Sequence, residues 1–191
     1  MDRFVDLLIA WQKTTHLVSP ASIPKLWTRH VADSLQLLDL APNARLWVDL
    51  GSGGGFPGLV IACALADKPE AQVHLVESNN RKAAFLREAV RITGVPAVVQ
   101  AMRIEKFVAN FAVTPDVITA RALLPFKSLM NNSFSLLSRG ALGLFPKGQD
   151  VAVELTEATK YWNIDYNLVP SRTDSLARIV VVRGLDRRQT L

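Results

Sequence analysis

The sequence predicts an α/β fold in which helices cover one mostly parallel sheet of seven strands. Short apolar segments of strand length alternate with helical segments along most of the chain, which is the pattern of βαβ units. One apolar segment, residues 46–50, leads directly into a glycine-rich loop and a helix. Residues 162–168 alternate between apolar and other residues, and after a loop residues 177–183 are nearly all β-branched, which predicts an antiparallel hairpin at the sheet edge.

Two amphipathic helices are expected ahead of the sheet. A helix over about residues 3–13 places Phe4, Leu7, Leu8 and Trp11 on one face. A helix over about residues 22–38 places Trp27, Val31, Leu35 and Leu38 on one side and Arg29, Asp33 and Gln36 on the other. The simplest expectation for Arg29 and Asp33, four residues apart, is an exposed ion pair on that helix. We expect residues 1–42 to form a helical cap on a core of residues 43–191, within one structural domain.

The stretch from Asp49 to Gly58 is the most informative part of the chain. A strand ends in an acidic residue and is followed by four glycines within residues 51–55. Glycine tolerates positive φ and has no Cβ, so a ligand can lie directly against the backbone N–H groups. Pro57 suits the first turn of the following helix. The loop should therefore lie at the carboxyl end of a buried strand, where open α/β sheets bind ligands.

Two cofactor classes fit this loop. From Asp49 the pattern is Asp-x-Gly-x-Gly-x-Gly, as in Rossmann-like methyltransferases that use S-adenosylmethionine. From Gly53 the same residues give Gly-x-Gly-x-x-Gly, the dinucleotide pattern, but this begins two residues further from the strand and leaves Asp49 without a role. Either cofactor needs an acid after the next strand to bind ribose hydroxyls, and Glu77 ends the strand at 72–77. A glycine-rich turn without a ligand is the third interpretation.

The remaining elements follow in alternation. A helix over residues 81–93 is expected after the capping segment 78–80 and ends at Gly94. Strands are expected at 97–101, 116–120 and 141–145, and helices at 104–110, 125–137 and from a capping Asp150 to Lys160. The hairpin strands fall at about 162–168 and 177–183.

Composition indicates the size of the core, the kind of partner and the cellular location to expect. The chain has 191 residues, 49% of them hydrophobic, enough for one sizeable core. Its formal charge of +5 favours a polyanionic partner without proving one. Cys63 is the single cysteine, and no metal-ligand spacing, signal peptide pattern or long apolar run is present. We therefore expect a cytoplasmic protein that uses no metal and no membrane.

The segment after the fourth predicted strand restricts the methyl acceptor. Enzymes that methylate the adenine amine usually carry Asn/Asp-Pro-Pro-aromatic here, whereas this chain has Thr119-Ala120-Arg121-Ala122-Leu123. Cytosine C5 chemistry needs a cysteine nucleophile, and Cys63 lies in a helix after Ala62. Guanine N7 is already nucleophilic, so its attack on a sulfonium methyl requires alignment and desolvation but no base.

Several motifs, in order along the chain, resemble one known family. They are Trp11-Gln12-Lys13 before His16-Leu17, Arg29-His30-Val31-Ala32-Asp33-Ser34-Leu35, Asp49 to Gly58, Glu77-Ser78 with Arg81-Lys82-Ala83-Ala84-Phe85-Leu86, Thr119-Ala120-Arg121-Ala122 and Phe145-Pro146-Lys147-Gly148. This set is similar to the small-subunit ribosomal RNA guanine-N7 methyltransferases, also called the glucose-inhibited division protein B family. The resemblance covers about residues 8–183 and implies an S-adenosylmethionine-dependent enzyme, acting as a monomer on N7 of a guanine in a decoding-region loop of 16S ribosomal RNA or the small ribosomal subunit.

The resemblance also implies roles for individual residues. The cofactor site would comprise Asp49, Gly51, Gly53 and Phe56 of the loop, Glu77 at the ribose, Ile104 and Glu105 beside the adenine, and Arg121. Arg121 would face the methionine end of the cofactor or the RNA, and Lys147 would be a second cation near the acceptor, so both are candidate catalytic residues. A nicotinamide-dependent oxidoreductase and a non-catalytic RNA-binding or assembly factor remain as alternatives.

Overall fold

The computed structural model describes residues 1–188 and contains one seven-stranded sheet. The strands are β1 (Leu46–Leu50), β2 (Gln72–Val76), β3 (Ala97–Gln100), β4 (Val117–Thr119), β5 (Leu142–Lys147), β6 (Trp162–Pro170) and β7 (Arg178–Arg187). Their order is β3-β2-β1-β4-β5-β7-β6. The first five strands are parallel to one another, and β7 is antiparallel to both β5 and β6. The predicted mostly parallel sheet with an antiparallel hairpin at its edge is confirmed.

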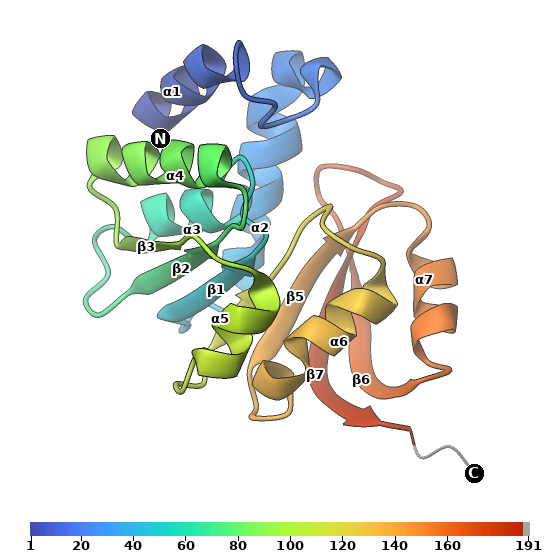
Figure 1. Cartoon of the computed structure of the whole chain (residues 1–191). Coiled ribbons are helices and arrows are strands. Elements are labelled where there is room, and N and C mark those ends of the chain that lie inside the picture. The colour runs from blue at the N-terminus through green and yellow to red at the C-terminus, as the bar shows by residue number, and fades with distance from the viewer. Residues whose placement is uncertain (189–191) are drawn as a thin grey trace.

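Helices cover both faces of the sheet (Figure 1). They are α1 (Asp2–Gln12), the 3₁₀-helix η1 (Pro20–Lys25), the π-helix η2 (Trp27–Ala32), α2 (Asp33–Leu40), α3 (Gly58–Ala64), α4 (Asn80–Thr93), α5 (Ile104–Asn110), α6 (Phe126–Leu137) and α7 (Val151–Ala158). The helices α2, α3 and α4 contribute to the core on one face, with α1 lying over α4, whereas α5, α6 and α7 contribute to the core on the other. This arrangement is a Rossmann-like three-layer α/β fold.

Alternation along the strands divides the core in two. Trp47 and Leu75 belong to the cluster shared with α1, α3 and α4, whereas Val48 and Val76 belong to the cluster shared with α5, α6 and α7. All four side chains are fully buried. Side chains of successive residues point to opposite faces of a sheet, so nearly continuous apolar strands are expected where helices cover both faces.

The second cap helix differs from its prediction. Residues 20–40 form a 3₁₀, a π and an α segment in succession instead of one regular helix. The shift of periodicity leaves Trp27 49% exposed, so its prediction as a core residue is wrong. It also buries Gln36, which a regular 3.6-residue period places on the polar side, and His30. The division into a cap of residues 1–42 and a core of residues 43–191 stays a prediction.

The helix after β2 begins and ends as its capping residues predict. The side chain of Asn79 accepts hydrogen bonds from the N–H groups of Arg81 (3.0 Å) and Lys82 (3.1 Å). Gly94 closes α4 in the left-handed conformation at φ +68°. By contrast, Asp150 precedes α7 without a side-chain capping bond.

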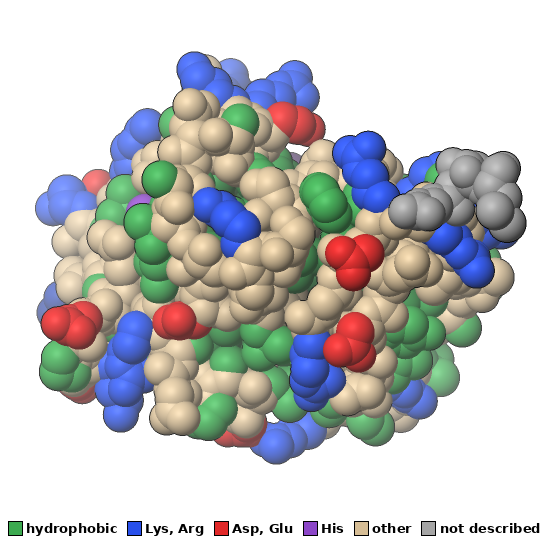
Figure 2. Space-filling view, turned by 90° about the horizontal axis from the view of Figure 1, so that it is seen from below, with side chains coloured by type: hydrophobic (Ala, Val, Ile, Leu, Met, Phe, Trp, Pro, Cys, Tyr) green, Lys and Arg blue, Asp and Glu red, His purple; other side chains and the backbone are tan. Residues whose placement is uncertain are grey.

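The face seen from below in Figure 1 mixes the two signs of charge. Lys and Arg side chains alternate with Asp and Glu among hydrophobic ones, on the part of this face that described residues form (Figure 2). Among residues 1–188, no helix has both the length and the apolar character to cross a membrane. A mixed surface of this kind offers no extended area of one charge to a polyanion.

Candidate functional site

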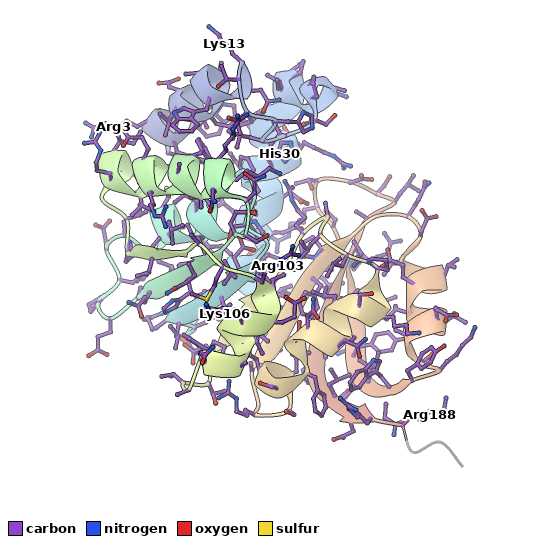
Figure 3. The ribbon with its side chains drawn as sticks, in the orientation of Figure 1. Arg3, Lys13, His30, Arg103, Lys106 and Arg188 are labelled. Carbon is purple, nitrogen blue, oxygen red and sulfur yellow. The ribbon has the colours of Figure 1, made fainter. Side chains whose placement is uncertain are left out.

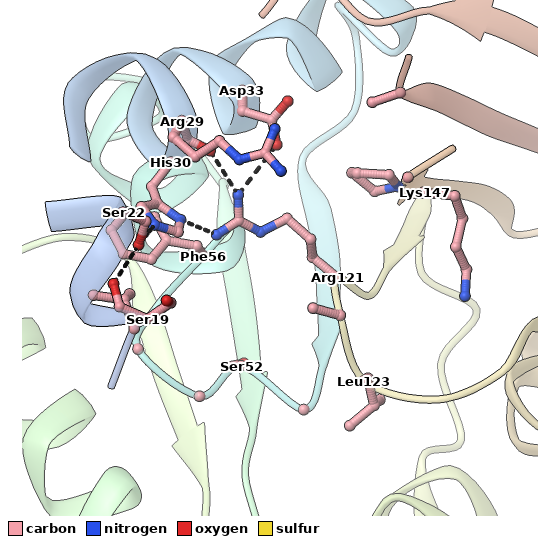
Figure 4. Close-up of a pocket in the computed structure, with 18 of the residues that line it drawn as sticks. Ser19, Ser22, Arg29, His30, Asp33, Ser52, Phe56, Arg121, Leu123 and Lys147 are labelled. Atoms are coloured by element: carbon pink, nitrogen blue, oxygen red, sulfur yellow. Dashed lines mark hydrogen bonds and ion pairs between the residues drawn. The ribbon is translucent and has the colours of Figure 1, made fainter. Parts of the chain in front are cut away.

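A large cavity lies at the carboxyl ends of the central parallel strands. Its volume is about 1080 Å³. Its walls are the glycine loop 51–56, the segment 121–125 after β4, the end of β5 at residues 146–148, the cap, and the start of β7 with Ser171 of the loop before it (Figure 4). This is the edge where open α/β sheets bind ligands, so the fold brings the sequence-predicted loop and Arg121 into one site.

Glu77 fixes the glycine loop. One oxygen of its carboxylate accepts a hydrogen bond from the N–H of Gly53 (2.9 Å), and the other accepts one from the N–H of Asn79 (2.7 Å). Gly51 lies at φ +71°, and an added Cβ there would clash with the side chain of Leu123. The loop therefore requires glycine for its backbone conformation and for its close approach to the segment after β4.

Asp49 is fully buried beneath the loop. Its Oδ2 accepts a hydrogen bond from the N–H of Gly58 (3.1 Å), and its Oδ1 has no partner among the described residues. Thr119 lies opposite Asp49 in the register of β4, and its buried Oγ1 also lacks a partner within residues 1–188. Burial raises the pKa of Asp49 to about 7. Asp49 thus supports the start of α3 and keeps one oxygen free beneath the loop.

Substitution of Gly58 by alanine is expected to destabilise the fold by about 1 to 3 kcal/mol, the usual cost of overpacking. An added Cβ would meet Asp49 Oδ2 and Leu75 Cδ2 at 2.5 Å each, which outweighs the gain in helix propensity of about 1 kcal/mol. Urea unfolding of Gly58→Ala measures the change. Gly148→Ala is the matched control, since its Cβ would meet nothing within 4 Å. Equal stabilities of the two variants would contradict the close packing at Gly58.

Arg121 is held by the cap. Its Nη1 donates to Asp33 Oδ2 (3.1 Å) and to the carbonyl oxygen of Arg29 (3.0 Å), and its Nη2 donates to His30 Nδ1. The guanidinium also lies 5.5 Å from the ring centre of Phe56. The side chains of Arg121 and Asp33 are 16% and 14% exposed. Arg121 is therefore a buried, paired cation that joins the segment after β4 to the cap (Figure 4).

His30 continues this contact. Because Arg121 donates to Nδ1, the ring carries its proton on Nε2 and donates it to Ser22 Oγ (2.7 Å). The ring stacks on Phe56 with centroids 4.8 Å apart. Burial, with the nearby charge of Arg121, lowers the pKa of His30 to about 4. A neutral imidazole therefore links the cap, the glycine loop and Arg121.

Lys147 is the last residue of β5 and is also paired. Its Nζ forms an ion pair with Glu154 Oε2 (2.7 Å) and donates to the carbonyl oxygen of Leu124 (2.9 Å). The same Glu154 oxygen accepts from the N–H of Phe126 (2.7 Å). Lys147 and Glu154 thus hold the far end of the segment 121–125, which Arg121 anchors at its start.

The structure differs from one predicted ion pair and leaves one predicted contact outside the cavity. The expected helix ion pair between Arg29 and Asp33 is wrong, because Arg29 pairs with Asp174 and Asp33 pairs with Arg121. Ile104 and Glu105 begin α5 and are not among the residues of the described chain that line the cavity, so their contact with adenine stays a prediction. Within residues 1–188, no group of three or more His, Cys, Asp or Glu side chains could hold a metal ion.

Comparison with solved structures concerns the fold. Two solved structures share the fold: a mutant of MtNAS in complex with S-adenosylmethionine (TM-score 0.63, 16% identity, 94% of this chain and 72% of that chain) and a cofactor-bound protein from MTB (TM-score 0.67, 15% identity, 96% and 90%). This chain thus shares the Rossmann-like α/β fold of these cofactor-bound proteins.

The sequence comparisons then give the family. The GidB family, described as rRNA small subunit methyltransferase G, matches residues 1–178. Proteins called ribosomal RNA small subunit methyltransferase G are 55% identical in Bradyrhizobium sp. strain BTAi1, over 98% of this chain and 84% of that protein, and 52% identical in Rhodopseudomonas palustris strain BisB5, over 98% and 81%. The chain belongs to this methyltransferase family, which confirms the resemblance and excludes the dinucleotide interpretation of the loop.

Proposed function

We propose that this protein transfers the methyl group of S-adenosylmethionine to N7 of a guanine in 16S ribosomal RNA. The observation that carries the proposal is the glycine loop at the cavity, whose Gly53 amide is fixed by Glu77 in a chain of the ribosomal RNA small subunit methyltransferase G family. Bound S-adenosylmethionine supplies an electrophilic sulfonium methyl group. The protein's own contribution is to bind, orient and desolvate.

The loop residues suit this cofactor. Gly51 has no Cβ beside Leu123, and both oxygens of Glu77 retain lone pairs for ribose hydroxyls after accepting the two backbone N–H groups. Phe56 is buried against His30 and keeps the loop against the cap. Asp49 would support the loop from below, because it is fully buried there and its Oδ2 holds the N–H of Gly58. These residues would hold the adenosyl and methionine parts in a fixed position.

The charges around the acceptor side suit guanine N7. Methylation there requires no removal of a proton, and the product base gains a positive charge. Two cations that line the cavity are compensated, Arg121 by Asp33 and Lys147 by Glu154. A compensated cation opposes a developing positive charge less than a free one does. Positioning therefore supplies most of the catalytic effect.

RNA is the proposed partner, in the cytoplasm, as free 16S RNA or within a small ribosomal subunit. The formal charge of +5 supports binding to a polyanion. Lys13 of the cap points outward (Figure 3), and Arg103 and Lys106, before and within α5, are exposed. The guanine would be presented unstacked or in a loop, because the deep groove of A-form RNA makes N7 inaccessible.

The test uses 16S RNA from cells with and without the gene, and the same RNA after incubation with the purified protein and S-adenosylmethionine. Borohydride and aniline cleave RNA at N7-methylguanine. We expect one cleavage product in wild-type RNA, its loss in the deletion strain, and its return after incubation. Identical cleavage in both strains would contradict the function.

Thermal unfolding with S-adenosylmethionine or NAD tests the cofactor separately, and only S-adenosylmethionine is expected to stabilise the protein.

A further inference from the structure

Asp33, at the first position of α2, contacts two walls of the cavity at once. Its Oδ2 accepts from Arg121 Nη1 (3.1 Å), which reaches it from the segment after β4. Its Oδ1 accepts from Thr173 Oγ1 (2.7 Å) in the loop between β6 and β7, and from Gln36 Nε2 (2.8 Å). A single carboxylate of the cap therefore joins two segments that are far apart in the sequence.

The contacts of Arg121 leave part of its guanidinium available. An arginine has five N–H donors in a fixed plane. Three of them are directed to Asp33, the carbonyl of Arg29 and His30. The Nε–H and one N–H of Nη2 have no hydrogen-bond partner within residues 1–188, and Arg121 lines the cavity. The cap thus fixes the plane of a group that can still donate to a ligand.

The charge of Asp33 matters as much as its position. Burial lowers the pKa of Arg121, and the adjacent Asp33 carboxylate is the largest influence that raises it. Without that carboxylate, a buried cation would face an acceptor that gains positive charge during methyl transfer. Repulsion between like charges in a poorly solvated cavity slows the reaction and has less effect on binding of the neutral base.

We propose that Asp33 is a positioning residue that orients Arg121 toward the cavity and neutralises its charge for methylation of guanine N7. This inference rests on the proposed function. In this proposal Asp33 affects the reaction only through Arg121. The loss of Asp33 should therefore appear in kcat and should depend on the presence of Arg121.

The test compares Asp33→Asn with Asp39→Asn. Asp39 lies on the same helix and forms an exposed ion pair with Arg172 in the loop between β6 and β7. It is therefore a carboxylate in a similar position that does not pair with Arg121. For Asp33→Asn we expect kcat to fall about 100-fold, because a misplacement of about 1 Å of a positioning group such as Arg121 can cost that much. The KM for RNA should be unchanged or lower, and the Kd for S-adenosylmethionine should stay within threefold of wild type. Asp39→Asn should retain all three values.

A double-mutant cycle separates positioning from a merely structural role. The variant Asp33→Asn/Arg121→Gln is expected to be no slower than Arg121→Gln alone, because Asp33 acts only through Arg121. Losses in kcat that multiply in the double variant, or an Asp33→Asn kcat within threefold of wild type, would overturn the proposal. If Asp33→Asn does not fold, Thr173→Val removes the hydroxyl that donates to Oδ1 and is expected to lower kcat about tenfold, and an unchanged kcat would equally overturn it.

Hydrogen exchange provides a measurement that does not require activity. Asp33→Asn is expected to increase amide exchange in residues 121–124 at least threefold, whereas Asp39→Asn leaves it unchanged. A wild-type protein that methylates no RNA would reject the proposed function, and this exchange result would still decide whether Asp33 positions Arg121. Equal exchange in the two variants would overturn the positioning role.

Discussion

Glu77→Ala is expected to weaken binding of S-adenosylmethionine about 100-fold. The substitution removes the carboxylate that holds the N–H groups of Gly53 and Asn79, and with it the proposed acceptor for the ribose hydroxyls. Hydrogen bonds to a charged group contribute about 1.5 to 3 kcal/mol each, and about 2.8 kcal/mol corresponds to 100-fold in Kd. Isothermal titration with S-adenosylmethionine measures the change.

Two further variants make this result specific. Glu77→Gln keeps one carboxyl-like oxygen but turns an NH₂ group toward one of the two backbone donors, so we expect an intermediate loss of about tenfold. Glu88→Ala removes an exposed carboxylate of α4 that pairs with Arg91 and should leave Kd within twofold. If folded Glu77→Ala binds the cofactor with wild-type affinity, the ribose is held elsewhere.

The sequence predicts the fold well because each of its signals is local. The acid and glycines from Asp49 to Gly58 mark a strand, a loop and a helix without reference to any distant residue. The capping side chain of Asn79 and the left-handed Gly94 likewise define α4 from neighbouring residues alone. Alternation along residues 162–168 and the β-branched run at 177–183 predict the hairpin, although the strands extend further, to Pro170 and Arg187.

The pairing of charges around the cavity could not be predicted in the same way. Asp33 and Arg121 are 88 residues apart, and only packing of the cap against the ends of the strands brings them together. The predicted period of the cap helix placed Asp33 on an exposed face, because no local signal indicated the π-helical turn of η2. Lys147 was predicted as a contact near the acceptor, and its pairing with Glu154 depends on how α7 returns to the sheet.

The neutral His30 and the raised pKa of Asp49 have opposite effects on stability. Asp49 titrates near pH 7 in the folded protein and near 3.8 when unfolded, so the folded state holds more protons between these values and loses stability as pH rises. His30 titrates near pH 4 when folded and near 6.5 when unfolded, so the folded state holds fewer protons there and gains stability as pH rises. The two effects oppose each other over pH 4 to 6.5.

Replacing either Asp49 or His30 should therefore expose the pH dependence of stability that the other contributes. In Asp49→Asn, the free energy of unfolding is expected to rise with pH from about 4 to 6.5, because only His30 remains. The asparagine oxygen can still accept from the N–H of Gly58, so the variant should fold.

In His30→Gln, whose amide can accept from Arg121 and donate to Ser22, the free energy of unfolding is expected to fall by up to about 4 kcal/mol between pH 4 and 7. Urea unfolding at half-unit steps of pH measures both variants against wild type, whose profile should be flatter than either. The free energy of unfolding should thus rise with pH in Asp49→Asn and fall with pH in His30→Gln. A free energy of unfolding that stays constant over this range in His30→Gln would show that the Asp49 carboxyl is ionised throughout it, so that a carboxylate and not a neutral acid lies beneath the loop.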